Sequence, residues 1–76
     1  MDKFEQEIRE KIRENLRKCR IEYGYTQEDL AIIIDLKPTT VASWEQGLSL
    51  PSIAMLYKLA KLYGKSIGYM YGEADK

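Results

Sequence analysis

The stretch GYTQEDLAIIIDLKPTTVASWEQG, residues 24–47, contains two short helical patterns separated by only a few residues. Thr26 is a favoured residue at a helix N-terminus, and Asp29 places a carboxylate in the first turn, where the helix end is positive. Asp35 begins the turn that follows. Pro38 suits the first turn of the next helix, because its missing N–H would have no partner there. The stretch therefore predicts two consecutive helices joined by a tight turn.

Helical spacing continues on both sides of this stretch, and no segment alternates as a strand does. Apolar residues at steps of three and four mark one face of a first helix that ends near Gly24, namely Phe4, Ile8, Ile12, Leu16, Cys19 and Tyr23. A fourth helix opens at Ser52 and ends at Gly64, with inward residues at Ile53, Leu56, Leu59, Ala60 and Tyr63. Ser66 caps a short fifth helix. The pattern predicts an all-α fold, a compact five-helix single domain over residues 1–76.

Composition excludes several classes of protein. The 76 residues include no histidine and one cysteine, which rules out an internal disulfide and argues against a zinc site. Cys19 has no histidine to act as its base, so we interpret it as a reduced thiol at the margin of the core. No cluster of titratable groups resembles an active site, and we expect no enzyme and no cofactor. With no apolar run of about 18 residues and a charged N-terminus, the sequence predicts a cytoplasmic protein without a membrane span.

The two helices of residues 24–47 point to a binding function. Ala31 is small enough for the second helix to cross the first closely, as in a helix-turn-helix. Such a pair lays its second helix in the major groove of DNA, with the N-terminal residues of that helix facing base edges. The exposed tip would carry Lys37, Pro38, Thr39, Thr40 and Ser43. Short side chains allow close approach, and threonine offers a hydroxyl to a base or phosphate and a methyl to thymine.

Together with PSIAMLYKLAKLYGKSIGYMY, residues 51–71, this stretch resembles the Cro/C1-type helix-turn-helix of the XRE family. The similarity covers about residues 8–71. The matching residues are Thr26, Gln27, Leu30, Ala31, Val41, Trp44, Glu45, Gly47, Pro51, Ser52, Leu59 and Ala60. The resemblance implies a lambda repressor-like DNA-binding fold with a recognition helix at about 38–47. It also implies a regulator that binds double-stranded DNA, usually as a dimer, in bacteria or phages.

The resemblance further implies roles for individual residues. Gln27 would contact phosphate from the start of the second helix, and Gln46 would approach the DNA backbone. The positions that would face the groove are Lys37, Pro38, Thr39, Thr40 and Ser43. Arg20 and Glu45 match a charged pair that ties the first helix to the end of the recognition helix, and we interpret this pair as architectural. Trp44 is assigned to the core.

Several features depart from the family pattern. Asp35 stands where glycine is usual in the turn, and aspartate tolerates a left-handed backbone better than most residues. Lys37 replaces the usual serine or threonine cap, which gives up about 1 kcal/mol of capping and places a cation beside the DNA. Pro38 has no side chain that hydrogen-bonds a base. The loop LSLP, residues 48–51, lacks the basic residues that commonly contact phosphate.

Charge carries little sign of a nucleic-acid partner. Twelve basic and twelve acidic residues give a formal net charge of zero, without the basic surplus usual in domains that bind nucleic acid. Arg9, Arg13 and Arg17 recur every fourth residue among several glutamates. Because pairs such as Glu7 with Lys11 have the i,i+4 spacing, we interpret this helix as solvated and salt-bridged.

A second interpretation stays open. Apolar residues occupy four positions where the family normally has polar ones, namely Ile32, Ile33, Leu48 and Leu50. If a partner covers them, the chain is a helix-turn-helix protein-interaction module, either antitoxin-like or a partner of the transcription machinery. The neutral charge and the loop without basic residues favour this alternative, whereas Gln27 and the small recognition tip favour DNA.

The favoured interpretation is a sequence-specific DNA-binding transcriptional regulator, a repressor that binds a palindromic operator as a homodimer. Two recognition helices about 34 Å apart would multiply the contacts of one. The dimer interface is predicted at Ile67, Tyr69, Met70 and Tyr71. There the two tyrosines are expected at the surface, because the isoleucine and the methionine supply the inward face. Phe4 and Ile8 form a competing interface.

Overall fold

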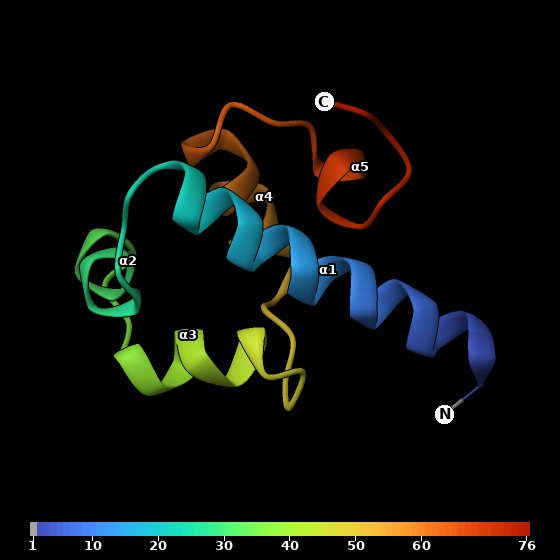
Figure 1. Ribbon diagram of the computed structural model, residues 1–76, viewed down its shortest axis with the longest axis horizontal. Coiled ribbons are helices and arrows are strands. Elements are labelled where there is room, and N and C mark those ends of the chain that lie inside the picture. The colour runs from blue at the N-terminus through green and yellow to red at the C-terminus, as the bar shows by residue number, and fades with distance from the viewer. Residues whose placement is uncertain (1) are drawn as a thin grey trace.

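The computed structural model describes residues 2–76 as five helices, and this range contains no strand. The helices are α1 (Lys3–Glu22), α2 (Gln27–Ile34), α3 (Pro38–Glu45), α4 (Ile53–Leu62) and α5 (Ile67–Met70) (Figure 1). The predicted all-α, five-helix fold is therefore confirmed. The third helix ends slightly earlier than expected, because Gln46 is its C-cap and Gly47 already has a φ of 78°.

The helix starts follow from side-chain capping. Thr26 Oγ1 accepts a hydrogen bond from the backbone N–H of Asp29 at 3.0 Å, and the Asp29 carboxylate accepts one from the N–H of Thr26 at 2.9 Å. Ser52 and Ser66 cap α4 and α5 through their hydroxyls, each at 3.0 Å. Lys37 makes no such bond, so α3 begins on the proline that follows it, as the sequence predicts.

The turn between α2 and α3 depends on one left-handed residue. Asp35 has φ 57° and ψ 48°, and it is the one non-glycine residue with positive φ among residues 2–76. This conformation lets the N–H of Leu36 donate to the carbonyl of Ala31 at 2.9 Å, which closes the end of α2. The expected left-handed aspartate is confirmed, and it sends the chain directly into α3.

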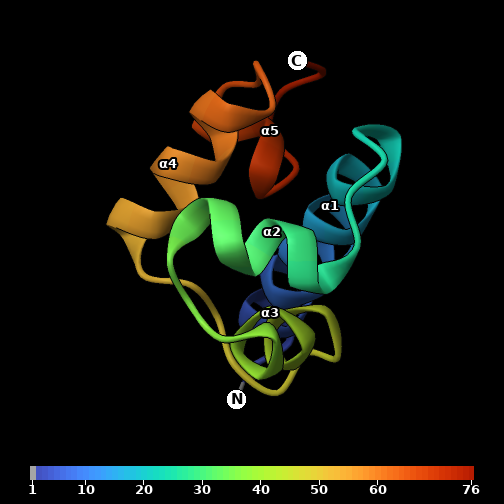
Figure 2. The ribbon, with the colours of Figure 1, turned by 90° about the vertical axis from the view of Figure 1, so that its left-hand side faces the viewer.

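The helices pack on both sides of α1. Helix α3 lies along one side of it, while α4 and α5 lie on the other (Figures 1 and 2). The buried apolar side chains come from all five helices and from Tyr63, just after α4, and they are Ile12, Leu16, Cys19, Leu30, Ala31, Ile34, Val41, Trp44, Leu56, Leu59, Ala60, Tyr63, Tyr69 and Met70. The cysteine is thus fully buried, deeper than the expected margin of the core, and burial raises the pKa of its thiol.

Three apolar residues predicted to lie on an inward face are exposed, and one of them is Tyr23, the C-cap of α1, at 46%. Phe4 is 71% exposed, because the first turns of α1 project beyond the body of the domain (Figure 1). Ile53 is 81% exposed at the first position of α4. Helical periodicity marks a face correctly, but a helix that extends past its neighbours leaves part of that face without a partner.

Helix α5 is held on α1 by Asn15. Its side-chain amide donates to the carbonyl oxygens of Tyr69 at 2.9 Å and Met70 at 3.3 Å, which would otherwise lack partners at the helix end. Gly72, with φ 88°, passes so close to Lys11 that a Cβ there would lie 2.4 Å from the lysine Cδ. The hydrogen bonds from Asn15 and the close approach of Gly72 to Lys11 hold the last residues of α5 against α1.

The orientation of α5 corrects the predicted exposure of Tyr69. Tyr69 is 8% exposed and Met70 is fully buried, so these two residues form the inward face of the helix. Ile67 and Tyr71 are half-buried and pack against the core. A four-residue helix presents little more than one turn, and Asn15 fixes which part of that turn meets α1. The prediction of a surface-exposed Tyr69 is therefore wrong, since its ring belongs to the monomer core.

None of the helices within residues 2–76 is both long and apolar enough to cross a membrane.

Candidate nucleic-acid interface

Helix α3 combines a buried face with an accessible N-terminal end. Val41, Trp44 and Glu45 are 1%, 5% and 7% exposed, and they anchor the helix to the rest of the domain. The predicted core position of the tryptophan is confirmed. On the other face Pro38 and Thr39 are exposed. Helix α3 also lies at one edge of the molecule (Figure 2), so its first turn is free to enter a groove.

A bidentate ion pair joins α1 to the end of α3. Arg20 Nε donates to Glu45 Oε2 at 2.7 Å, and Arg20 Nη2 donates to Glu45 Oε1 at 2.9 Å. The third guanidinium nitrogen, Nη1, donates to the carbonyl of Tyr25 at 2.7 Å. The two charged side chains are only 12% and 5% exposed, and the hydrogen bond to the carboxylate raises the pKa of Arg20. The structure thus brings together the two residues that the sequence suggested as an interhelical pair.

Gln27 belongs to the same cluster. Its side-chain Nε2 donates to Glu45 Oε1 at 3.2 Å, which links the first residue of α2 to α3. An amide nitrogen carries two N–H groups, so one remains for another acceptor. Gln27 is half-buried and held in place, a suitable state for a donor to a DNA phosphate.

Ser43 is engaged within the protein. Its hydroxyl lies 2.7 Å from the hydroxyl of Ser49, and its carbonyl accepts from the N–H of Leu48 at 3.0 Å. The loop after α3 therefore folds back onto the last turns of the helix. Sequence reasoning placed the Ser43 side chain in the groove and missed Ser49, since nothing in the local spacing shows that a loop residue returns to α3.

The remaining predicted contact residues lie at the two ends of α3, with Gln46 as the C-cap and the others at the N-terminal end. Lys37, Pro38, Thr39 and Gln46 are exposed, and Thr40 is half-buried. The N-terminal end thus offers a cation, a rigid ring and two threonines with short side chains. Threonine offers a hydroxyl and a methyl group on a short side chain.

No group of three or more histidine, cysteine, aspartate or glutamate side chains within residues 2–76 is placed to hold a metal ion.

The chain belongs to the helix-turn-helix family, of the Cro/C1 or XRE type. A model of that family matches residues 16–70, which include all of α2 through α5 and part of α1. The predicted family is therefore confirmed.

Two relatives show what this chain is similar to. An uncharacterized HTH-type transcriptional regulator of Archaeoglobus fulgidus is 34% identical over 56 residues, which cover 74% of this chain and 80% of that protein. A multiprotein-bridging factor 1 of Eremothecium gossypii is 39% identical over 64 residues, which cover 78% of this chain but 42% of that protein. This chain therefore spans less than half of the second relative. No solved structure matches the chain significantly.

The family and the first relative indicate a DNA-binding regulator of transcription. They leave the expected bacterial or phage source as a prediction.

Proposed function

We propose that this protein is a sequence-specific DNA-binding regulator that reads the major groove with the N-terminal end of α3. The observation that supports this most strongly is the cluster of Arg20, Glu45 and Gln27, with hydrogen bonds of 2.7 to 3.2 Å. It locks α1, α2 and α3 into one rigid unit. A rigid unit keeps the α3 tip and the Gln27 donor in fixed register, so the tip meets base edges when Gln27 meets the backbone.

Each predicted contact residue has a role in this proposal. Thr39 and Thr40 contact base edges, and Pro38 fills space without a hydrogen bond. Lys37 and Gln27 contact phosphates at the N-terminal end of α3 and supply affinity independent of sequence. Gln46 approaches the backbone at the other end, and Ser43 supports the loop in addition to any base contact.

The finer proposal is a repressor that binds a palindromic operator as a homodimer. One α3 covers a few base pairs, so two copies related by a two-fold axis are needed for a specific site. Two surfaces compete for the pairing. One is the accessible part of Ile67 and Tyr71, and the other is Phe4 with Ile8 at the start of α1. Sedimentation of Tyr71→Asp and Phe4→Asp variants separates them, because only the variant at the true interface becomes monomeric.

Selection from a random duplex library with the purified protein tests the function. Enrichment of a two-fold symmetric sequence supports both operator recognition and the dimer. Enrichment of a single half-site supports a monomeric DNA-binding protein. Recovery of no preferred sequence refutes sequence-specific binding.

A second candidate function is a partner of the transcription machinery. It is favoured by the relative named multiprotein-bridging factor 1 and by three apolar side chains at the surface. Ile32, Leu48 and Ile53 are 80%, 74% and 81% exposed. They come from α2, the loop after α3 and the start of α4, so a partner protein that covers them would have to span these three elements. The duplex selection distinguishes the candidates, since a protein that acts solely through another protein enriches no DNA sequence.

A further inference from the structure

Arg13 lies across the C-terminal end of the recognition helix. A Cβ on Gly47, just after α3, would lie 3.1 Å from Arg13 Cδ and 3.7 Å from Nε. The side chain therefore packs directly on the backbone of this turn. The sequence suggested a solvated helix with Glu7–Lys11 pairs, but within residues 2–76 the ion pairs of α1 with its own glutamates are those of Arg13, with Glu10 and with Glu14.

The face of α1 that carries Arg13 also carries Arg20. Seven residues are about two helical turns, so the two side chains share one side of the helix. The guanidinium of Arg20 already donates hydrogen bonds to Glu45 and to the carbonyl of Tyr25. The side chain of Arg13 is 30% exposed, compared with 12% for Arg20. Part of the Arg13 side chain is thus accessible to a ligand that reaches the end of α3.

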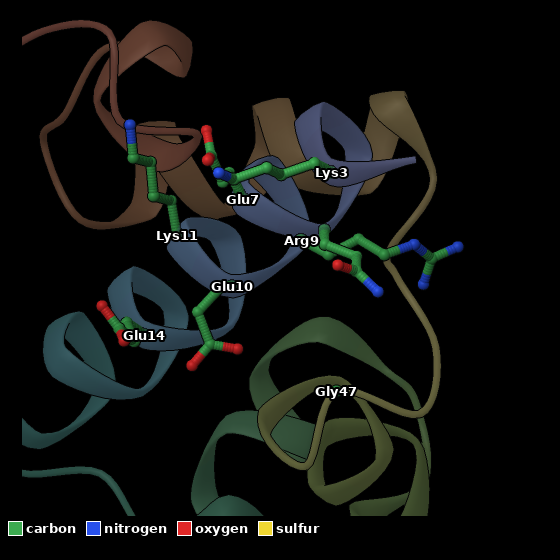
Figure 3. Close-up of a pocket in the computed structure, with 8 residues that line it drawn as sticks. Lys3, Glu7, Arg9, Glu10, Lys11, Glu14 and Gly47 are labelled. Atoms are coloured by element: carbon green, nitrogen blue, oxygen red, sulfur yellow. The ribbon is translucent and has the colours of Figure 1, made fainter. Parts of the chain in front are cut away.

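Arg9 extends the same face by one more turn. Figure 3 shows its side chain pointing toward the loop that follows α3, whereas Lys11 points away toward the opposite side of α1. Arg9 lines a hollow together with Phe4, Ile8 and Leu50. Within residues 2–76 it forms no ion pair. Two arginines therefore gather where α1 passes the end of α3.

A helix in the major groove is flanked by phosphates at both of its ends. Lys37 and Gln27 serve the N-terminal end of α3. The loop at the other end, residues 48–51, contains no basic residue. We propose that Arg9 and Arg13 contact the DNA backbone at the C-terminal end of α3 and replace the cations that this loop lacks. The inference rests on the proposed function, because it extends the same DNA surface.

Glu10 restrains this contact. Its carboxylate accepts hydrogen bonds from Nε and Nη2 of Arg13, and the arginine lowers the pKa of that carboxyl. Glu10 is 54% exposed, so it faces the same region as the guanidinium and repels a phosphate there. Its neutralisation removes the repulsion and leaves Arg13 with the longer pair to Glu14, at 4.0 Å. Glu10→Gln therefore strengthens binding to every duplex, a result that a purely structural ion pair does not produce.

The test is titration of the selected duplex and of a random duplex at several salt concentrations. Arg13→Gln and Arg9→Gln should each weaken both duplexes several-fold and lower the slope of log affinity against log salt by about 0.9. Glu10→Gln should strengthen both several-fold. Lys11→Gln is the matched control, since it removes a cation from the other side of the same helix, and it should leave the slope unchanged. Circular dichroism of each variant verifies that it is folded.

Wild-type slopes in both arginine variants would overturn the inference, and so would unchanged binding in Glu10→Gln. Arg13→Lys keeps the charge and should keep the slope. If Arg13→Gln fails to fold, Glu10→Gln and Arg9→Gln still decide. A wild-type protein that binds no duplex refutes the proposed function itself, whereas a wild-type protein that binds normally beside unchanged variants refutes only the arginine contacts.

Discussion

Removal of the Glu45 carboxylate should destabilise the fold far more than loss of a surface ion pair. Glu45→Ala leaves Arg20, whose side chain is 12% exposed, with two of its hydrogen bonds missing. It also takes the acceptor from Gln27. The charge of Arg20 then stays largely out of water without its partner, and this uncompensated desolvation is the dominant cost.

The magnitude follows from the burial of the pair. Loss of one partner of a buried ion pair costs about 3 to 5 kcal/mol, and we expect about 3 kcal/mol because Arg20 keeps its bond to the carbonyl of Tyr25. A domain of this length is stable by about 4 to 11 kcal/mol in total. At about 4 to 8 °C per kcal/mol, the melting temperature should fall by about 12 to 24 °C.

Urea and thermal unfolding followed by circular dichroism provide the measurement. Glu7→Ala is the control, since this exposed carboxylate on α1 has no ion pair within residues 2–76, and it should change stability by less than about 0.5 kcal/mol. The double variant Arg20→Met, Glu45→Leu should be more stable than the sum of the two single losses predicts. Additive losses, or a Glu45→Ala variant within about 1 kcal/mol of the wild type, would refute the reasoning.

Three further predictions concern binding and stability. Thr39→Ala should reduce discrimination at one base pair by about 1 kcal/mol. Lys37→Ala should weaken binding to all duplexes alike and lower the slope of log affinity against log salt by about 0.9. If both variants weakened specific and random DNA to the same extent, these roles would be contradicted. Asn15→Ala should destabilise the domain by about 1 to 3 kcal/mol and expose the α5 amides to hydrogen exchange, because two carbonyls lose their donor. The Asp29 pKa is lowered by its hydrogen bonds to Thr26, so the stability that this carboxylate adds to the fold is present above about pH 4 and is lost as pH falls through the lowered pKa. Asp29→Asn should therefore lose less melting temperature than the wild type between pH 5 and about pH 2. An equal loss in both proteins would exclude the capping box as a source of acid sensitivity.

Local chemistry made much of this fold predictable. The Thr26 cap is satisfied by a partner three residues away, and the Asp35 turn is closed by backbone groups within a few positions. Such signals depend on the nearest neighbours in the chain, so the sequence alone determined where the helices begin and turn. The order of the two helices and the small tip of α3 then indicated a DNA-binding surface.

The packing of the helices against one another determined which residues are buried and which distant residues come into contact. Tyr69 is buried and Phe4 is exposed. What covers each residue depends on which other helices lie beside it, and the period of the sequence pattern does not show this. Likewise Ser43 meets Ser49, and Arg13 lies against Gly47 thirty-four positions later. Sequence spacing specifies the face of a helix, but the contacts on that face depend on elements brought there by packing of the whole chain, where burial of apolar surface outweighs local preference.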